Sequence, residues 1–484
     1  MIWEYAIWAF LVAALHLALV VSVTFHAVLW KRDVRSVISW VGLVWLTPFV
    51  GSFLYFCFGI NRLHRKAIKL NVPKNLQLPD HSFDDGEFLD ETESQISERP
   101  NLRGLERTGA NLTGLPLLPG NEVKPLVDGD EAFPAMLAAI KGAQRSISLQ
   151  SYIFDHDRVG KQFQDALCVA QKRGVEIRIL IDGVGSSYSR PNMIRELRRA
   201  GIRVAAFLPT MLPRLPNTAN LRNHRKILVV DGIKGFTGGT NIREGHTLGL
   251  NPRFPVRCLH FEISGPVVAQ MQRTFALDWA FTTGEQLTGD AWFPNPTSSG
   301  VGSIWARSVQ HGPDEDFRKL SELILGAISI AEREIVVFTP YFLPNNSLID
   351  ALNVAALRGV RVRIYLPESN NIAVVQWACM AQLWQILEKG CRVFLTPRPF
   401  DHTKLFLIDS AWALIGSANW DPRSLRLNFE FNIECYGESL IQPLETIVES
   451  KAESAREITL AEVNQRPFPI RIRDGVARLL MPYL

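Results

Sequence analysis

One sequence pattern occurs twice in this chain, and it constrains the possible folds more than any other feature. Both copies have the form HxKxxxxD, followed by six residues, a Gly-Gly or Gly-Ser pair, one more residue and Asn. The first copy comprises His224, Lys226, Asp231, Gly239 and Asn241, and the second, 178 positions later, comprises His402, Lys404, Asp409, Ser417 and Asn419. A single HxK would carry little information, but two copies that agree as far as the distant Asn indicate a duplicated unit.

The sequence around the motifs repeats as well. Residues 145–154 and 175–182 are typical of strands and enclose a helical stretch, and the same order returns at 334–342, 348–358 and 358–367. Strand–helix–strand order predicts an α/β fold with a mostly parallel sheet. We therefore expect two pseudo-symmetric α/β/α sandwich halves, residues 119–302 and 303–484, with one shared site between them.

The paired motifs suit chemistry on a phosphodiester. His and Lys two positions apart on a strand point to the same face, and the glycines allow a ligand to approach the backbone. Two lysines and two Asn amides can stabilise the phosphoryl oxygens. One neutral His can attack phosphorus, and the other, protonated, can donate its proton to the leaving alkoxide. The two lysines already supply positive charge, so we expect neither a metal nor another cofactor.

On these motifs the chain resembles the phospholipase D superfamily, and within it the bacterial cardiolipin synthases. The resemblance covers nearly the whole length and includes stretches outside the motifs: Trp40, Pro48, Gly51, residues 58–59, 222–226, 265–268, Phe275, Trp279, residues 340–344, 419–424 and 428–430. It implies that a phosphatidyl group passes from one phosphatidylglycerol to a second, with release of glycerol. The hydrolase of the same superfamily, and a transferase with another alcohol acceptor, are the alternatives.

The resemblance also implies roles for single residues. It suggests His224 as the nucleophile and His402 as the acid/base, although the two copies are near-equivalent and the sequence alone leaves their order open. Six residues are expected near the substrate: Asn241, Asn419, Gly239, Ser417, Glu430 and Tyr341. Tyr152 and Tyr341 end matching strands, and they either line the lipid entrance or belong to the core.

The acidic residues of the two halves differ. Asp231 and Asp409 belong to the catalytic motifs, but we expect them to anchor a turn rather than to contact substrate. The family resemblance implies a further carboxylate that orients each His. Glu430 occupies that position in the second half, whereas the first half has Cys258. Either one His lacks a carboxylate partner, or Glu262 or Glu244 replaces it.

The first 70 residues are predicted to associate with a membrane. Residues 5–30 and 36–60 contain no Asp, Glu, Lys or Arg, and about 20 apolar residues suffice for a spanning helix. A signal peptide is disfavoured because Glu4 lies at the start and no small-residue cleavage site follows. Two full spans and a re-entrant hairpin broken at Pro48 remain alternatives. We expect the bacterial inner membrane, with the catalytic region on the cytoplasmic side.

The formal net charge of +4 hides a segregation of charge. Residues 1–70 carry a net +5, residues 71–110 a net −5 and the rest +4. The basic first segment fits anionic lipid headgroups. Residues 71–118 are predicted to form an acidic linker, unstructured or weakly ordered as far as 110.

The modest charge of the catalytic region disfavours a nuclease or another nucleic-acid partner. The intact motifs disfavour a non-catalytic scaffold.

The cysteines and two apolar segments lie outside the motifs. The six cysteines lack CxxC spacing and are expected to be free thiols in a reducing compartment. The apolar, proline-rich residues 207–216 either dip into the bilayer or pack on their own domain. The C-terminal residues 468–484 alternate arginines with apolar residues, and they either lie on the membrane surface or form a final helix docked on the second half.

Overall fold

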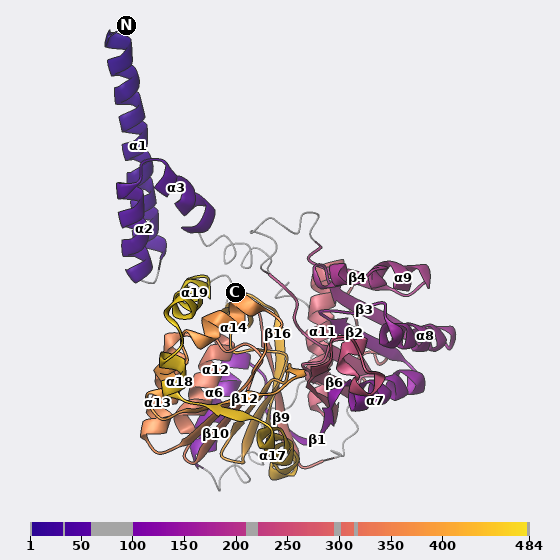
Figure 1. The fold of residues 1–484 in the computed structure, drawn as a ribbon. Coiled ribbons are helices and arrows are strands. Elements are labelled where there is room, and N and C mark those ends of the chain that lie inside the picture. The colour runs from indigo at the N-terminus through magenta and orange to yellow at the C-terminus, as the bar shows by residue number, and fades with distance from the viewer. Residues whose placement is uncertain are drawn as a thin grey trace. The chain divides into compact units, whose positions relative to one another are not determined.

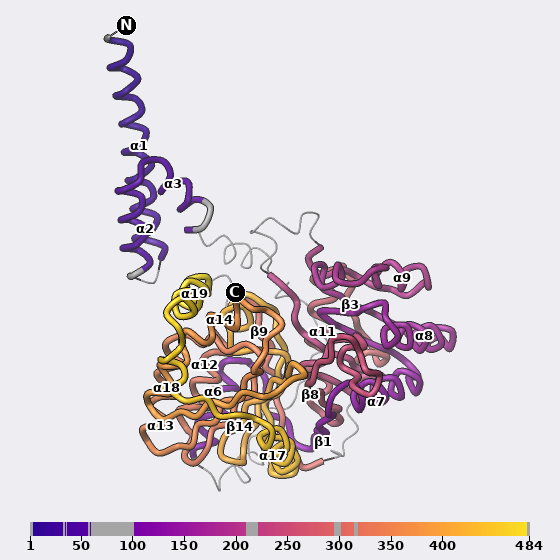
Figure 2. The backbone as a smooth tube through the Cα atoms, in the orientation of Figure 1, coloured from indigo at the N-terminus to yellow at the C-terminus, as the bar shows by residue number. Residues whose placement is uncertain are grey.

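The computed structural model describes residues 2–31, 34–59, 100–209, 221–294, 302–313 and 318–481. The chain divides into two compact units, residues 1–69 and 70–484. Most of the predicted acidic linker, and most of the apolar loop predicted at 207–216, lie outside the described residues. Figures 1 and 2 show the fold and the backbone trace of each unit.

The first unit is a helical hairpin. Helix α1 (Ile2–Trp30) is largely apolar, and an 18-residue stretch within Trp3–Trp30 reaches a mean hydropathy of 2.4, enough by length and composition to cross a membrane. Helix α2 (Val34–Leu46) packs against it, and α3 (Val50–Leu54) continues into a π-helical turn, η1 (Tyr55–Gly59). Tyr55 is buried, and its hydroxyl lies 2.7 Å from Nδ1 of His26.

The second apolar run does not form one long helix. Helix α2 has 13 residues, about 20 Å at ~1.5 Å per residue, which is shorter than the hydrocarbon core of a bilayer. The chain then breaks at Pro48, and Phe49 adopts a left-handed φ of 58°. A side chain at Gly51 would approach the Leu43 carbonyl oxygen to 2.7 Å, so only glycine allows this fold-back.

The second unit is built on one sheet of 15 strands. Its order is β17-β12-β11-β10-β14-β15-β16-β9-β1-β8-β6-β5-β2-β3-β4. Strands β1 (Leu118–Val127) and β9 (Ile304–His311) pair at the centre, where the two halves meet. The order outward from this pair is the same on both sides, except for the additional edge strand β17 (Arg456–Ile458). The duplication seen in the sequence is therefore a pseudo-symmetry of the sheet.

The elements of the first half follow one another in an order that the second half repeats. In the first half they are α7 (Asp128–Gly142), β2 (Ser146–Ser151), α8 (Arg158–Lys172), β3 (Glu176–Asp182), η2 (Gly185–Tyr188), α9 (Met193–Arg199), β4 (Val204–Phe207), β5 (Ile227–Val230), β6 (Lys234–Gly238), η3 (Glu244–His246), η4 (Leu248–Leu250), β7 (Val256–Arg257), β8 (Leu259–Ser264) and α11 (Val267–Thr283). In the second half they are α12 (Lys319–Ile330), β10 (Glu334–Phe338), α13 (Asn346–Leu357), β11 (Arg361–Pro367), α14 (Ala373–Met380), α15 (Trp384–Leu387), β12 (Arg392–Thr396), β13 (Phe400–Asp401), β14 (Leu405–Ile408), β15 (Trp412–Gly416), α16 (Pro422–Arg426), β16 (Glu430–Tyr436), α17 (Glu438–Glu453), α18 (Leu460–Asn464) and α19 (Phe468–Leu479).

The sheet is mixed, so the expectation of a mostly parallel sheet was wrong. Strands β2, β3 and β4 are parallel, as are β10, β11 and β12. The strands nearer the centre are antiparallel, because short connections join β5 to β6 and β14 to β15. The strand–helix–strand pattern in the sequence covers only the outer units and does not indicate these hairpins.

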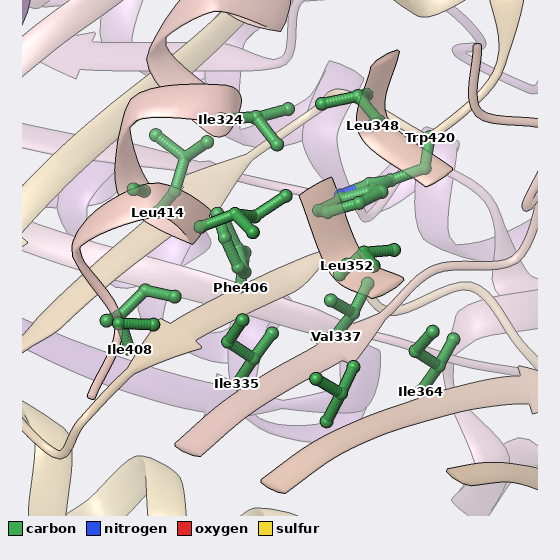
Figure 3. Close-up of a cluster of buried hydrophobic side chains, with 14 of the residues drawn as sticks. Ile324, Ile335, Val337, Leu348, Leu352, Ile364, Phe406, Ile408, Leu414 and Trp420 are labelled. Atoms are coloured by element: carbon green, nitrogen blue, oxygen red, sulfur yellow. The ribbon is translucent and has the colours of Figure 1, made fainter. Parts of the chain in front are cut away.

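Helices cover both faces of the sheet. Along β5, Leu228 and Val230 pack with α7 and α8, whereas Ile227 and Val229 face the opposite core, which also contains α11 and α17 residues. The second half has a corresponding core beneath α12 and α13. Figure 3 shows Phe406 and Trp420 in this core, with ring centroids 5.3 Å apart. Each motif strand, β5 or β14, is thus packed between two hydrophobic cores, one on each face of the sheet.

The end of the predicted linker is part of the fold. Residues Pro100–Thr113 form helix α6, whose Leu102 and Leu105 are buried in the core of the second half. The fully buried Arg307 bonds Glu434 at 2.6 Å and Glu106 at 3.2 Å, and it also donates to the Glu106 carbonyl oxygen. The sequence pattern missed this helix because its apolar face is short and lies next to the acidic run.

Candidate active site

The motif histidines lie three residues before strands β5 and β14, and each is attached to the opposite half. The backbone N–H of His224 donates to the Phe429 carbonyl oxygen at 2.9 Å, and that of His402 donates to the Arg257 carbonyl oxygen at 2.7 Å. The short parallel pair β7–β13 and the bridge between Asn223 and Phe429 form these contacts. The site is therefore assembled across the two halves, as the duplicated motif predicts.

Each motif lysine turns back toward its own histidine. Nζ of Lys226 donates to the His224 carbonyl oxygen, and Nζ of Lys404 to the His402 carbonyl oxygen, both at 2.8 Å. Both lysines are buried, and burial is the main reason that the pKa falls to about 7 for Lys226 and about 8 for Lys404. A bound anion would reverse this effect, so the pair is suited to hold a phosphoryl group in its charged form.

His224 is oriented by a buried carboxylate from the other half. Its Nδ1 lies 3.0 and 3.1 Å from the two carboxylate oxygens of Glu430. Glu430 also accepts hydrogen bonds from Ser417 Oγ at 2.5 Å and Asn428 Nδ2 at 3.1 Å. Burial alone would raise the pKa of Glu430, but the facing His224 and Lys226, together with Ser417, lower it to about 2. The carboxylate therefore stays ionised.

The strand register identifies the counterpart of Glu430 in the first half. Backbone N–H of Ser417 donates to the Phe431 carbonyl oxygen, and that of Gly239 donates to the Leu259 carbonyl oxygen, both at 3.0 Å. Ser417 is thus equivalent to Gly239. The residues just before the two acceptors, Glu430 and Cys258, are equivalent too. The Ser–Glu pair beside His224 is replaced by a Gly–Cys pair beside His402.

His402 accordingly has a neutral partner. Its Nδ1 lies 3.1 Å from the Gly239 carbonyl oxygen, and the buried Cys258 Sγ contacts the His402 carbonyl oxygen at 3.4 Å. A Cβ at Gly239 would lie 2.5 Å from Cys258 Sγ, so a serine equivalent to Ser417 does not fit. Of the two alternatives from the sequence, the geometry favours the missing carboxylate.

The two proposed substitutes for that carboxylate are engaged elsewhere. Glu262 bonds Nζ of Lys234 at 2.5 Å, and Glu244 bonds Nε of Arg158 at 3.1 Å. No hydrogen bond joins either of them to His402 among the contacts of the described residues. The loss falls on His402, although Cys258 belongs to the first half, because each half supports the histidine of the other.

The two histidines have different hydrogen-bond partners at Nδ1, but the pKa of each is lowered. Burial lowers the pKa of His224 to about 4, with Lys226 and Lys404 acting in the same direction and Glu430 opposing them. Burial, Lys404 and His246 hold the pKa of His402 well below its usual range. Both imidazoles are therefore neutral near pH 7 in the free protein, and Nδ1–H of His224 donates to Glu430, which leaves Nε2 of His224 unprotonated.

The motif aspartates lie outside the reacting centre. Asp231 accepts hydrogen bonds from the backbone N–H groups of residues 144–146, and Asp409 accepts from those of residues 332–334, at 2.7–3.2 Å. Both have a left-handed φ, 54° and 53° respectively. Each aspartate ties the turn after its motif strand to the start of the neighbouring strand, β2 or β10. This position matches the anchoring role expected from the sequence.

The remaining predicted residues surround the histidines in pairs. Asn241 Oδ1 accepts from the Ile153 N–H at 3.3 Å, and Asn419 Nδ2 donates to Ser424 Oγ at 3.2 Å. The ring of Tyr152 lies 5.3 Å from that of His224. The ring of Tyr341 lies 6.2 Å from that of His402, and its hydroxyl donates to Asn371.

Buried polar side chains that the sequence pattern did not indicate bond the residues next to each motif histidine. Asp278 of α11 bonds Arg225, Asn223 and Gln150 at 2.6–3.1 Å. Lys451 of α17 bonds Asp401 and Thr403, which flank His402, at 2.6 and 3.2 Å. Asn223 and Asp401 are equivalent, as are Arg225 and Thr403, so the charges are reversed between the halves. The polar residues next to each motif histidine were visible in the sequence, but their partners Asp278 and Lys451 are distant in sequence and could not be inferred from it.

His246 is a further neighbour of the site. Its ring lies 6.3 Å from that of His402, and its Nε2 lies 3.4 Å from the Asn241 N–H. Burial is the first cause that lowers the pKa of His246, to about 3. Among the described residues, no group of three or more His, Cys, Asp or Glu side chains is arranged to hold a metal ion.

Comparison with known proteins places the chain in a family. The family described as "Cardiolipin synthase, PLD-like domain" matches residues 136–279 and 324–451. The chain belongs to the cardiolipin synthase family of the phospholipase D superfamily. This result confirms the family and the enzyme class expected from the motifs, a phosphatidyltransferase.

Full-length relatives and a solved structure agree with this assignment. The chain is 33% identical to the major cardiolipin synthase ClsA of Bacillus subtilis, covering 94% of this chain and 95% of the relative. It is also 33% identical to the cardiolipin synthase of Geobacillus kaustophilus, covering 98% and 92%. A phosphatidylserine synthase from Haemophilus influenzae has the same fold, with a TM-score of 0.62 at 16% identity, over 78% of this chain and all of that one.

The asymmetry of the two histidines predicts unequal effects of substitutions at equivalent positions. Glu430→Gln removes the charge that orients His224 but keeps the shape, so activity should fall by about ten-thousandfold, as when the carboxylate of a catalytic triad is neutralised. Cys258→Ser, the matched change beside His402, should leave the rate close to that of the wild type. Initial rates of product formation on lipid vesicles test this pair. Equal losses in both variants would contradict the geometric assignment.

Proposed function

We propose that the protein makes cardiolipin from two phosphatidylglycerol molecules and releases glycerol. The observation that carries the proposal is the pair of motif histidines held across the two halves, one facing a carboxylate and the other a backbone carbonyl. The names of the full-length relatives support the substrate class and the product. The phospholipid is thus the partner of the site, and no nucleic acid is part of this proposal.

The first step forms a covalent intermediate. Nε2 of His224 attacks phosphorus, forming a P–N bond as the P–O bond to glycerol breaks. A proton from His402 passes to the departing glycerol oxygen. The negative charge of the phosphodiester raises the low pKa of His402, so the bound substrate itself supplies the condition for this proton donation. Lys226 and Lys404 balance the charge on the phosphoryl oxygens.

The second step completes the transfer. A glycerol hydroxyl of the second phosphatidylglycerol attacks phosphorus, and His402 accepts its proton while the P–N bond to His224 breaks. The roles follow from the supports of the two rings. The intermediate places a positive charge on the imidazole of His224, which the ionised Glu430 stabilises at 3.0 Å. His402 needs a partner that does not trap its proton, and the neutral Gly239 carbonyl oxygen suits this need.

Transfer is favoured over hydrolysis by the surroundings of the site. His224 and His402 are only 8% and 7% exposed, and the aromatic rings of Tyr152 and Tyr341 flank them. Little room for water, with lipid close by, favours a lipid hydroxyl as the acceptor. Phosphatidic acid as the main product would instead indicate the hydrolase, and a different phospholipid product would indicate another alcohol acceptor.

The protein acts at a bacterial cell membrane. Helix α1 is the candidate span, and the break after α2 supports a re-entrant second segment rather than a second full span. A re-entrant second segment puts the positive charge that the sequence places around the apolar runs on one side of the membrane. The positive-inside tendency puts that side, and the catalytic region with it, in the cytoplasm.

A product assay tests the proposed reaction. Purified full-length protein with phosphatidylglycerol vesicles should yield cardiolipin and glycerol in equal amounts. His224→Ala and His402→Ala should each abolish cardiolipin formation, because one removes the nucleophile and the other the proton donor. Thin-layer analysis of labelled lipid and an enzymatic glycerol assay measure both products. Activity that survives both substitutions would refute the site.

The pH profile tests the role of His402 as the acid. Its protonated form is needed, so the rate should fall as the pH rises through its pKa in the bound complex. Cys258→Asp adds a carboxylate beside His402, which stabilises the imidazolium, raises that pKa and moves the alkaline limb of the rate profile to higher pH. The profile of Cys258→Ser is the control. An alkaline limb that stays in place in Cys258→Asp would contradict the role.

A further inference from the structure

The C-terminal helix α19 presents an apolar stripe to the surface. Phe468, Ile472, Val476 and Leu479 follow one another at spacings of four, four and three residues, which places them on one face of the helix. They are 73%, 51%, 56% and 77% exposed, and Leu480, just past the helix, is 48% exposed. Such a continuous exposed face marks a surface that is covered in the working protein.

The opposite face of α19 is firmly attached to the second half. Asp474 is buried and forms ion pairs with Arg466 and Arg473. Arg466 also donates to the Met380 carbonyl oxygen at 2.9 Å, at the end of α14. The guanidinium of Arg473 lies 4.4 Å from the centre of the Trp377 ring on the same helix. Helices α19 and α14 lie side by side (Figures 1 and 2). The exposed stripe is therefore a rigid surface.

Positive charge flanks the stripe. Arg471 and Arg478 are exposed on one side of it, and Arg473 lies on the other. At about 100° per residue, this arrangement is a basic amphipathic helix: Arg471 and Arg478 would reach lipid headgroups while the stripe enters the acyl boundary, and Arg473 is held against Asp474 and Trp377. The charge is complementary to an anionic bilayer, and the apolar residues fit its interior.

The surface is connected to the site through the residues that pack around Tyr341. Ala477 of α19 packs in a small core with Val375 and Ala378 of α14 and with Leu343, and Tyr341 packs against the same core. The ring of Tyr341 in turn lies 6.2 Å from that of His402. Helix α14 follows the carboxyl end of β11, and Tyr341 follows that of β10, so both lie at the same edge of the sheet.

We propose that α19 is a second membrane contact, which docks on an anionic phospholipid bilayer and holds the side of the site that carries Tyr341 toward the lipid surface. Helix α1 attaches the chain to the membrane, but one span does not fix the orientation of the catalytic unit. The apolar stripe with its arginines supplies that orientation. The inference rests on the proposed function only for its kinetic consequence, whereas the contact itself is independent of catalysis.

Photocrosslinking tests the contact without relying on activity. The photoreactive residue p-benzoylphenylalanine replaces Ile472, or, as a matched control, Val354 of α13, which is 54% exposed. The full-length protein is reconstituted in nanodiscs of phosphatidylglycerol or of phosphatidylcholine. We expect lipid adducts at position 472 in about tenfold excess over position 354, and more with phosphatidylglycerol. Equal adducts at both positions, or crosslinks to a second copy of the chain, would overturn the proposal.

Kinetics test its consequence with a second matched pair. Val476→Asp/Leu479→Asp places two charges in the stripe, and Val354→Asp/Leu357→Asp places two charges at the same spacing on α13. We expect the stripe variant to lose about tenfold in rate on phosphatidylglycerol bilayers but nothing on a short-chain monomeric phosphatidylglycerol, and the control to lose nothing on either. Equal losses on both substrates, or no loss, would contradict the docking role. If the wild type forms no cardiolipin at all, the proposed function fails while the crosslinking result still stands.

Discussion

The backbone hydrogen bond from each motif histidine to the opposite half is the constraint on which the rest of the structure depends. His224 bonds Phe429, and His402 bonds Arg257. These two bonds fix which residues of one half can reach the imidazole of the other. Whether a histidine has a carboxylate partner follows from the residue next to each acceptor, because Glu430 follows Phe429 and Cys258 follows Arg257. The two halves thus form a single site that neither could form alone.

A duplicated fold does not require duplicated chemistry. The reaction needs one histidine that carries a positive charge in the intermediate and one that gives and regains a proton. Glu430 with Ser417 suits the first need, and the Gly239 carbonyl oxygen beside Cys258 suits the second. The supporting charges behind the motifs are reversed as well, with Asp278 behind one and Lys451 behind the other. The backbone of the two halves is pseudo-symmetric, whereas the side chains beside His224 and His402 differ and suit different proposed roles.

The sequence was informative where the structure is local or repeated. The duplicated HxK motif predicted the family and the α/β halves, and the four apolar residues after each HxK correctly indicated the buried strands β5 and β14, although the His and Lys themselves precede those strands. The sequence was uninformative where partners are distant. It named Glu430 and Cys258, but only the three-dimensional pairing shows that Glu430 serves His224 and leaves His402 without a carboxylate. The antiparallel centre of the sheet was missed because the short β5–β6 and β14–β15 connections were not recognised as hairpins, and helix α6 was missed because the core of the second half on which it packs is distant in sequence.

The location of the covalent intermediate tests the central claim most directly. Full-length protein mixed with phosphatidylglycerol is quenched within the first turnover and digested under conditions that preserve phosphohistidine, and the peptides are analysed by mass spectrometry. The division of roles predicts a phosphatidyl adduct on the peptide that contains His224 and none on the peptide that contains His402. An adduct on His402 alone, or equal labelling of both histidines, would contradict it.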